Sequence, residues 1–214
     1  MDLCFPIPYS LFPIPYSLFP AIIMIVNPSD YKISHEDYLE GEKISPIRHE
    51  YIRGEVYAMV GGSDAHETIA GNLFALIKNK VRGTGCRAYI GNMKVHIKTA
   101  DSYYYPDVMV TCDSRDRNNG YFKQYPSLII EVLSPSMEAF NRGDKFADYR
   151  QIETLQEYVL ISQNKINIEC FRQNQDGRWV LFTYQQNQQI QLESINFTCQ
   201  VSEIYEDVLD FNLP

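Results

Sequence analysis

The sequence predicts a single domain of the α/β or α+β class, built around a mixed central β-sheet flanked by helices. Helical and strand-like patterns alternate along the chain. One strand-like run, SLIIEVL at residues 127–133, is almost entirely apolar, as a strand buried on both faces is. Apolar residues make up 45% and charged residues 21% of the 214 residues, which is a globular composition sufficient for one good core but not for two ordinary domains.

The first residues do not share this pattern. Residues 5–20 read FPIPYSLFPIPYSLFP, a heptapeptide repeat whose prolines exclude a coiled coil. The nucleotide string CCCTATT, read repeatedly, encodes the same repeat, so we interpret it as translated short-repeat DNA with Met24 as the natural start. A signal peptide fits poorly because no Lys or Arg precedes the apolar stretch, and a polyproline ligand is a weaker alternative. We expect a non-native or disordered extension over residues 1–23 and the domain over residues 24–214.

Local signals predict the first elements of the domain in order. A short helix is expected from Ser34, because its hydroxyl can cap the first turn and acidic residues follow it. Residues 49–60 alternate around Gly54 and predict a strand pair or a bent strand. After the break at residues 61–63, apolar side chains recur every four positions and predict a long helix. These side chains are Ile69, Leu73, Ile77 and Val81.

The rest of the chain is rich in strand-like runs. They lie at residues 87–90, 94–98, 104–111, 127–133, 158–162, 165–172, 179–184 and 190–192. A polar helix is expected over residues 142–151, and a short helix near residues 202–208 closes the chain. This succession of helices and strands is the pattern of a mixed sheet with helical cover.

Charge and cysteine content exclude several classes of protein. The formal charge of −8 excludes a uniformly basic nucleic-acid coat, although a local basic groove or an acidic metal site is compatible with it. The cysteines are scattered and form no C-x-x-C pair, so we expect reduced core thiols rather than a disulfide scaffold or a zinc knuckle. They are Cys4, Cys86, Cys112, Cys170 and Cys199. No apolar window is long enough for a membrane span, and we expect a cytoplasmic protein with no membrane partner.

Two carboxylates stand where strands should be apolar. Asp107 follows Pro106 in YYYPDVMV, and Glu131 lies inside SLIIEVLSPS. Alone, such an Asp is often a turn former and such a Glu an edge residue that faces water. If the two strands are neighbours, both carboxylates can project from one edge of the sheet. Paired carboxylates need a cation or a proton between them, and hard oxygen ligands suit Mg²⁺ or Mn²⁺.

Together with DKFADYR, these motifs resemble the Uma-type restriction endonuclease family of bacterial proteins, which belongs to the PD-(D/E)xK nuclease superfamily. The resemblance runs from about Ile33 to Tyr158, with the C-terminus as the alternative end. It implies a restriction-endonuclease-like fold and a metal-dependent phosphodiesterase. Carried over by motif, the metal-binding carboxylates are Asp107 and Glu131, and the backbone carbonyl of Val132 is a further ligand.

The sequence departs from the superfamily pattern two residues after the Glu, where Leu133 replaces the usual lysine. The resemblance instead assigns that role to Lys145, in DKFADYR, whose long stem can reach back over the strand edge. The alternative for Lys145 is a solvated lysine on a polar helix. Glu55, in RGEVYAM, is a further candidate carboxylate. His66, in DAHETI, is a candidate neutral base at a helix N-terminus, although capping or packing explains it equally well.

The function that we predict is metal-assisted hydrolysis of nucleic-acid phosphodiester bonds, with DNA as the substrate and Mg²⁺ or Mn²⁺ as the cofactor. An enzyme that cuts both strands is often a symmetric homodimer. The alternative is a catalytically decayed module that binds nucleic acid or protein, with Leu133 as the trace of the lost lysine. No G-x-S-x-G elbow or phosphate-binding G-x-x-x-x-G-K-[ST] loop occurs, which argues against a serine hydrolase and an NTPase.

Overall fold

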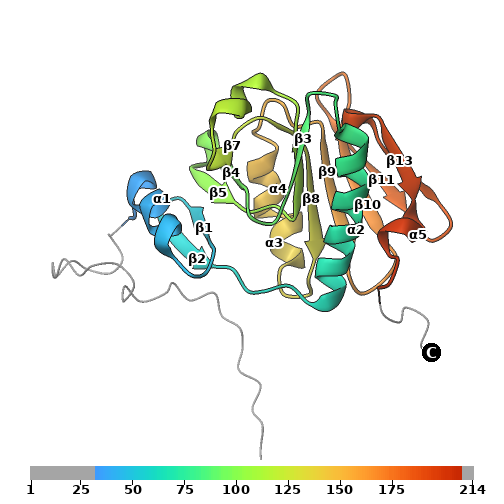
Figure 1. Cartoon of the computed structure of the whole chain (residues 1–214), viewed down its shortest axis with the longest axis horizontal. Helices are drawn as coiled ribbons and strands as arrows, with labels where there is room; N and C mark the ends of the chain where they lie inside the picture. The colour runs from blue at the N-terminus through green and yellow to red at the C-terminus, as the bar shows by residue number, and fades with distance from the viewer. Residues whose placement is uncertain (1–31, 209–214) are drawn as a thin grey trace, which may run out of the picture. The chain divides into compact units, whose positions relative to one another are not determined.

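The structure is a computed structural model that describes residues 32–208. The predicted N-terminal extension and the domain start at Met24 lie outside the described residues, so both stay predictions. The described residues fall into two compact units, one that ends at Val60 and one that begins at Gly61. Figure 1 labels most of the helices and strands of both units.

The first unit contains a helix and a β-hairpin among its described residues. Its elements are α1 (His35–Ile44), β1 (His49–Ile52) and β2 (Glu55–Ala58), and the two strands pair antiparallel. The Ser34 hydroxyl caps α1 by accepting the Asp37 N–H at 3.1 Å, as the sequence predicts. The hairpin turn places Arg53 and Gly54 at φ values of 52° and 95°. The second value is a conformation that glycine adopts without steric cost, so Gly54 favours this turn.

The centre of the second unit is a six-stranded sheet with the order β11-β10-β9-β8-β6-β3. Its strands are β3 (Arg87–Ile90), β6 (Val108–Thr111), β8 (Pro126–Leu133), β9 (Glu157–Ser162), β10 (Ile168–Gln173) and β11 (Trp179–Tyr184). In this sheet β8 and β9 run parallel, and the remaining neighbours are antiparallel. The sheet is therefore mixed, which confirms the predicted fold class.

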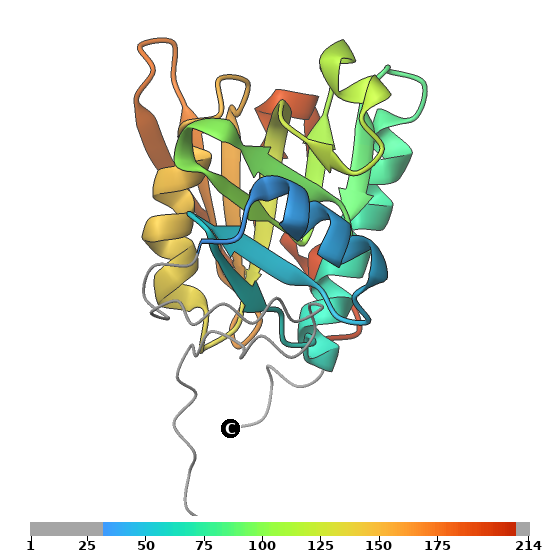
Figure 2. The same ribbon diagram turned by 90° about the vertical axis from the view of Figure 1, so that its left-hand side faces the viewer.

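Helices cover both faces of this sheet (Figure 2). α2 and α5 lie on one face together with the hairpin β12–β13, and α3 and α4 lie on the other. Their bounds are α2 (Asp64–Val81), α3 (Glu138–Arg142), α4 (Asp144–Tyr149), α5 (Val201–Ile204), β12 (Gln189–Leu192) and β13 (Phe197–Gln200). The helix expected over residues 142–151 corresponds to α4, and Gly143, whose φ of −103° and ψ of −100° are not helical, separates it from α3. Within residues 32–208, no helix is long and apolar enough to cross a bilayer.

Three short strands and three 3₁₀ helices complete the second unit. β4 (Lys94–Ile97) pairs antiparallel with β5 (Ser102–Tyr104) and parallel with β7 (Phe122–Lys123). The 3₁₀ helices are η1 (Lys98–Ala100), η2 (Ser114–Asn118) and η3 (Glu193–Ile195). The strand expected over residues 104–111 is two strands, because Pro106 has no N–H for a ladder hydrogen bond. The break at Pro106 leaves Asp107 directly before β6.

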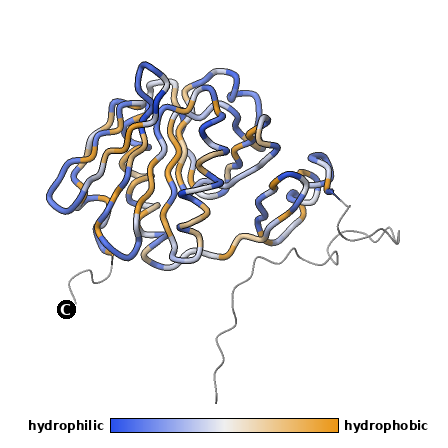
Figure 3. The backbone as a smooth tube through the Cα atoms, turned by 180° about the vertical axis from the view of Figure 1, so that it is seen from behind, coloured by the Kyte–Doolittle hydropathy of each residue, from blue (hydrophilic) through white to orange (hydrophobic). Residues whose placement is uncertain are grey.

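The main core lies between α2 and the six-stranded sheet. The periodic apolar face of α2 packs against alternate residues of β6, β8 and β9, and Figure 3 colours these strands as hydrophobic along most of their length. The core residues of these elements include Ile69, Leu73, Ile77, Val108, Val110, Leu128, Ile130, Val132, Val159 and Ile161, all at most 3% exposed. Each such side chain stabilises the fold by about 1.5–3 kcal/mol. Side chains alternate between the two faces along a strand, and Leu128, Ile130 and Val132 face α2. Glu131 and Leu133 of β8 therefore point to the other face, which α3 and α4 cover.

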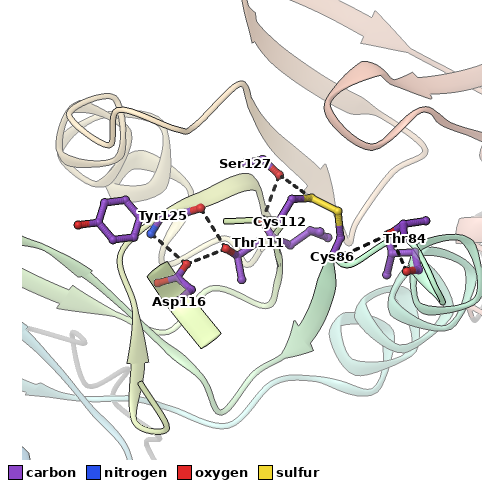
Figure 4. Close-up of a disulfide and its surroundings, with 9 residues drawn as sticks. Thr84, Cys86, Thr111, Cys112, Asp116, Tyr125 and Ser127 are labelled. Atoms are coloured by element: carbon purple, nitrogen blue, oxygen red, sulfur yellow. Dashed lines mark hydrogen bonds between the residues drawn. A yellow bond between two sulfur atoms is a disulfide. The ribbon is translucent and has the colours of Figure 1, made fainter. Parts of the chain in front are cut away.

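A disulfide joins Cys86 and Cys112, with 4.0 Å between their Cα atoms (Figure 4). The expectation of reduced thiols is wrong for this pair. The two residues are 26 positions apart in the sequence, and the antiparallel register of β3 and β6, which pairs Arg87 with Thr111, brings them together. Cys170 and Cys199 are buried free thiols, as expected, and burial raises the pKa of each to about 12. Such thiols are unreactive near neutral pH.

Candidate active site

Asp107 and Glu131 lie at the same end of the β6–β8 pair in the second unit. Val108 lies opposite Ile130, and Asp107 directly precedes Val108 while Glu131 directly follows Ile130. The backbone of Asp107 is held because its carbonyl accepts the Gly91 N–H at 2.9 Å. The two carboxylates therefore stand at the same end of two neighbouring strands, and both charges act on His66.

The Asp107 carboxylate is held by two donors from different elements. Its Oδ2 atom accepts the backbone N–H of Val132 at 2.7 Å and lies 3.2 Å from Nε2 of His66. These contacts orient the side chain toward β8 and the first turn of α2. Val132 thus reaches Asp107 through its N–H, and the role of its carbonyl as a metal ligand stays a prediction.

Glu131 is held from α4. Its side chain is 4% exposed, and Oε1 accepts a hydrogen bond from the Tyr149 hydroxyl at 2.9 Å and lies 3.0 Å from Nζ of Lys145. Lys145 and Tyr149 are four residues apart, so they project from the same side of the helix. Glu131 therefore has a cationic and a neutral donor on the same carboxylate oxygen.

The environment of Lys145 is not that of a solvated surface lysine. Its side chain is 5% exposed, and its ammonium lies 5.3 Å from the ring centroid of Tyr104 as well as beside Glu131. Leu133, which occupies the usual lysine position, is 3% exposed on the same face of β8 as Glu131. Lys145 of α4 therefore places its ammonium beside Glu131. A lysine at position 133 would approach the same carboxylate from β8.

Next to Lys145 and Glu131 lies a second set of buried polar side chains, which was not predicted from the sequence. The Tyr104 hydroxyl donates to Oδ2 of Asp148 at 2.6 Å, and the Ser102 hydroxyl donates to the same atom at 3.4 Å. Asp148 is 2% exposed. The signal in the sequence was the spacing of Lys145, Asp148 and Tyr149 in DKFADYR, which puts all three on one side of a helix.

His66 lies in the first turn of α2, with its side chain 16% exposed. Burial lowers its pKa, but the hydrogen bond to Asp107 and the negative charges of Asp107, Glu67 and Glu131 raise it, and the net shift is upward from 6.5. The helix dipole on its own disfavours a charged imidazole, whereas the carboxylates near His66 favour it. The role of His66 as a neutral base stays a prediction.

Glu55 lies in β2 of the first unit, where it is exposed and accepts a short hydrogen bond from the Tyr57 hydroxyl. Burial, together with this hydrogen bond and the Glu55 charge, raises the pKa of Tyr57 to about 12. A part for Glu55 in metal binding stays a prediction. The structure thus brings together Asp107, Glu131, Lys145 and His66 in the second unit, while their chemical roles are also predictions.

The donor set suits a hard divalent cation. Within residues 32–208 no group of three or more His, Cys, Asp and Glu side chains converges as a metal cluster. Mg²⁺, however, is commonly bound by one or two carboxylates together with waters and substrate phosphate. Asp107 and Glu131 are two adjacent carboxylates, each held by hydrogen-bond donors on one oxygen, and therefore fit such an ion.

The fold defines the class of protein first. It resembles the crystal structure of a protein described as a putative nuclease belonging to DUF820, from Anabaena variabilis ATCC 29413, with a TM-score of 0.66. The match covers 80% of this chain and 99% of that chain at 16% identity, so the likeness concerns the fold alone. This chain therefore has the same mixed-sheet α/β fold as that protein.

Sequence comparison then identifies the family. The model of Uma2, described as "Putative restriction endonuclease", matches residues 35–202, so the chain belongs to this family. Two relatives from Synechocystis sp. (strain ATCC 27184 / PCC 6803 / Kazusa) carry the names uncharacterized protein slr1290 and sll1609. The first is 41% identical over 174 residues, 81% of this chain and 92% of the relative. The second is 32% identical over 160 residues, 74% of this chain and 90% of the relative. The resemblance inferred from the motifs is confirmed.

Proposed function

We propose that the protein is a metal-dependent endonuclease that hydrolyses phosphodiester bonds in nucleic acid, with DNA as the substrate. One observation carries this proposal: adjacent carboxylates, Asp107 and Glu131, lie beside a buried ammonium 3.0 Å from Glu131. Family membership supports the reaction class, because the family model is described as a restriction endonuclease.

Asp107 and Glu131 would hold Mg²⁺ or Mn²⁺, and the Val132 carbonyl is the further ligand that we infer from the family resemblance. When bound, the cation supplies charge neutralisation at the phosphate and a lower pKa for bound water. Hydrogen bonds from Val132, His66 and Tyr149 orient the two carboxylates before the cation arrives. Such preorganised ligands need little rearrangement on binding.

Lys145 would stabilise the negative charge that develops on the scissile phosphate, or orient the attacking water. Its stem is buried, so its charge acts where the local dielectric constant is lower than in water. Contact with Glu131 fixes the starting position of the ammonium beside the carboxylate pair. His66, with its raised pKa, can hold a proton against Asp107.

The test compares metal binding with cleavage. Wild-type protein should bind Mn²⁺ in a calorimetric titration and cleave DNA with Mg²⁺, while Asp107→Asn and Glu131→Gln should lose both. Lys145→Ala should keep Mn²⁺ binding but lose cleavage by about 10²–10⁴-fold, because it removes a charge-stabilising group. Asp144→Asn is the matched control, since Asp144 is an exposed carboxylate beside Lys145 on α4. Cleavage at the wild-type rate by Asp107→Asn would refute the proposed site.

The alternative is a decayed nuclease-fold module, and its supporting observation is the buried Leu133 at the usual lysine position. The ammonium of Lys145 beside Glu131 favours the enzyme over this alternative. If the wild-type protein does not bind Mn²⁺ and does not cleave DNA, the decayed binding module becomes the better explanation of the fold. Homodimer formation and a cytoplasmic location also stay predictions.

A further inference from the structure

We propose that Tyr149 is a positioning residue of this site, whose phenol fixes the orientation of the Glu131 carboxylate for the cation. The inference rests on the proposed metal site and adds to it a residue that contacts neither substrate nor cation. Its starting point is that the Tyr149 hydroxyl donates to Oε1 of Glu131 at 2.9 Å, inside the protein where both side chains are buried.

The position of the phenol is itself well defined. Tyr149 is completely buried, and its ring centroid lies 5.4 Å from the ring centroid of Tyr104 and 5.4 Å from that of Tyr158. A tyrosine side chain has only two main torsions, and neighbouring rings on two sides restrict both. The hydroxyl can therefore act as a fixed donor, and the carboxylate must orient to meet it.

Lys145 is a less suitable group for this purpose, although it contacts the same oxygen. An ammonium is a compact charge with three equivalent N–H donors, so it imposes little direction on a carboxylate. In the proposed reaction the same ammonium also acts on the phosphate or the attacking water. A neutral, rigid phenol can keep its hydrogen bond to Glu131 while the ammonium shifts. Both donors meet at Oε1, so the phenol can hold this oxygen in place when the ammonium shifts.

The decisive comparison is between two tyrosine-to-phenylalanine variants of the same aromatic cluster. Tyr149→Phe removes the hydroxyl that contacts Glu131 and keeps the ring. Tyr158→Phe is the matched control, because Tyr158 is equally buried but its hydroxyl donates to the backbone carbonyl of Asn141 at 3.0 Å. Each variant loses one buried hydroxyl and keeps the ring, so a merely structural role predicts the same behaviour for both.

The measurement is the dissociation constant of Mn²⁺ by calorimetry, with the folded fraction of each variant checked by thermal melting. Tyr149→Phe should weaken Mn²⁺ binding by about 10–100-fold, the usual cost of losing a hydrogen bond to a metal-binding side chain, and Tyr158→Phe should leave it unchanged. If Tyr149→Phe melts below the assay temperature, both variants and the wild type are compared in trimethylamine N-oxide, which favours the compact state.

Each outcome decides the matter. Selective loss of affinity in Tyr149→Phe supports the positioning role. Unchanged affinity in Tyr149→Phe, or an equal loss in both variants, overturns it while the metal site itself stands. Absence of Mn²⁺ binding by the wild type overturns both the proposed function and this inference. The wild-type titration therefore distinguishes failure of the proposed function from failure of the positioning role alone.

Discussion

Replacing Lys145 by Met tests whether the buried ion pair with Glu131 contributes to folding as its geometry implies. The two side chains are 5% and 4% exposed and 3.0 Å apart, so neither charge can be solvated by bulk water. Met keeps the length and apolar volume of the lysine stem but leaves the carboxylate without its cation. Breaking a buried pair in this way costs about 3–5 kcal/mol.

The lower end of that range applies here. Glu131 keeps the hydrogen bond from Tyr149, and a hydrogen bond to a charged group is worth about 1.5–3 kcal/mol. We therefore expect Lys145→Met to lower the free energy of unfolding by about 3 kcal/mol, which a domain of ordinary stability, about 5–15 kcal/mol, survives. The double variant Lys145→Met/Glu131→Leu removes both charges and should recover most of the loss, because apolar replacement of a buried pair is often neutral or stabilising.

Urea denaturation of the single and double variants measures these differences as a thermodynamic cycle. Lys78→Met, at an exposed position of α2, is the control and should change the free energy of unfolding by no more than about 0.5 kcal/mol. A loss of less than about 1 kcal/mol for Lys145→Met would mean that the ammonium is solvated, and would refute this account of the pair.

Two further predictions concern His66 and the disulfide. Because the folded-state pKa of His66 lies above 6.5, its pairing with Asp107 stabilises the fold fully below about pH 6.5 and loses this contribution as the pH rises through the folded-state pKa. Asp107→Asn should lower the pKa of His66 in an NMR titration and remove that part of the pH dependence of stability; an unshifted titration would contradict the contact. The Cys86–Cys112 bond closes a loop over a separation of 26 residues, so reducing it should lower the free energy of unfolding by about 3 kcal/mol. Urea denaturation with and without dithiothreitol checks this value, and identical transitions would contradict a formed disulfide.

Much of the site could be predicted because its residues violate local patterns. Asp107 after a proline and Glu131 inside an apolar strand are costly unless they are paired, so they stood out without any knowledge of the fold. Lys145 came from a motif resemblance, and the structure places its ammonium beside Glu131. Tyr149 and Asp148 did not stand out, because a tyrosine and an aspartate on a polar helix are ordinary surface residues until the partner strand is known.

The sequence by itself determined the class of fold, the apolar face of α2 and the two carboxylates, because hydrophobic period and local polarity are properties of short segments. Tertiary structure alone decided the Cys86–Cys112 pairing, the shared oxygen of Glu131 and the direction of the His66 pKa shift. Each of these depends on segments far apart in the chain whose register and packing bring side chains within a few ångströms. At such distances burial and charge outweigh the local preferences that a sequence displays.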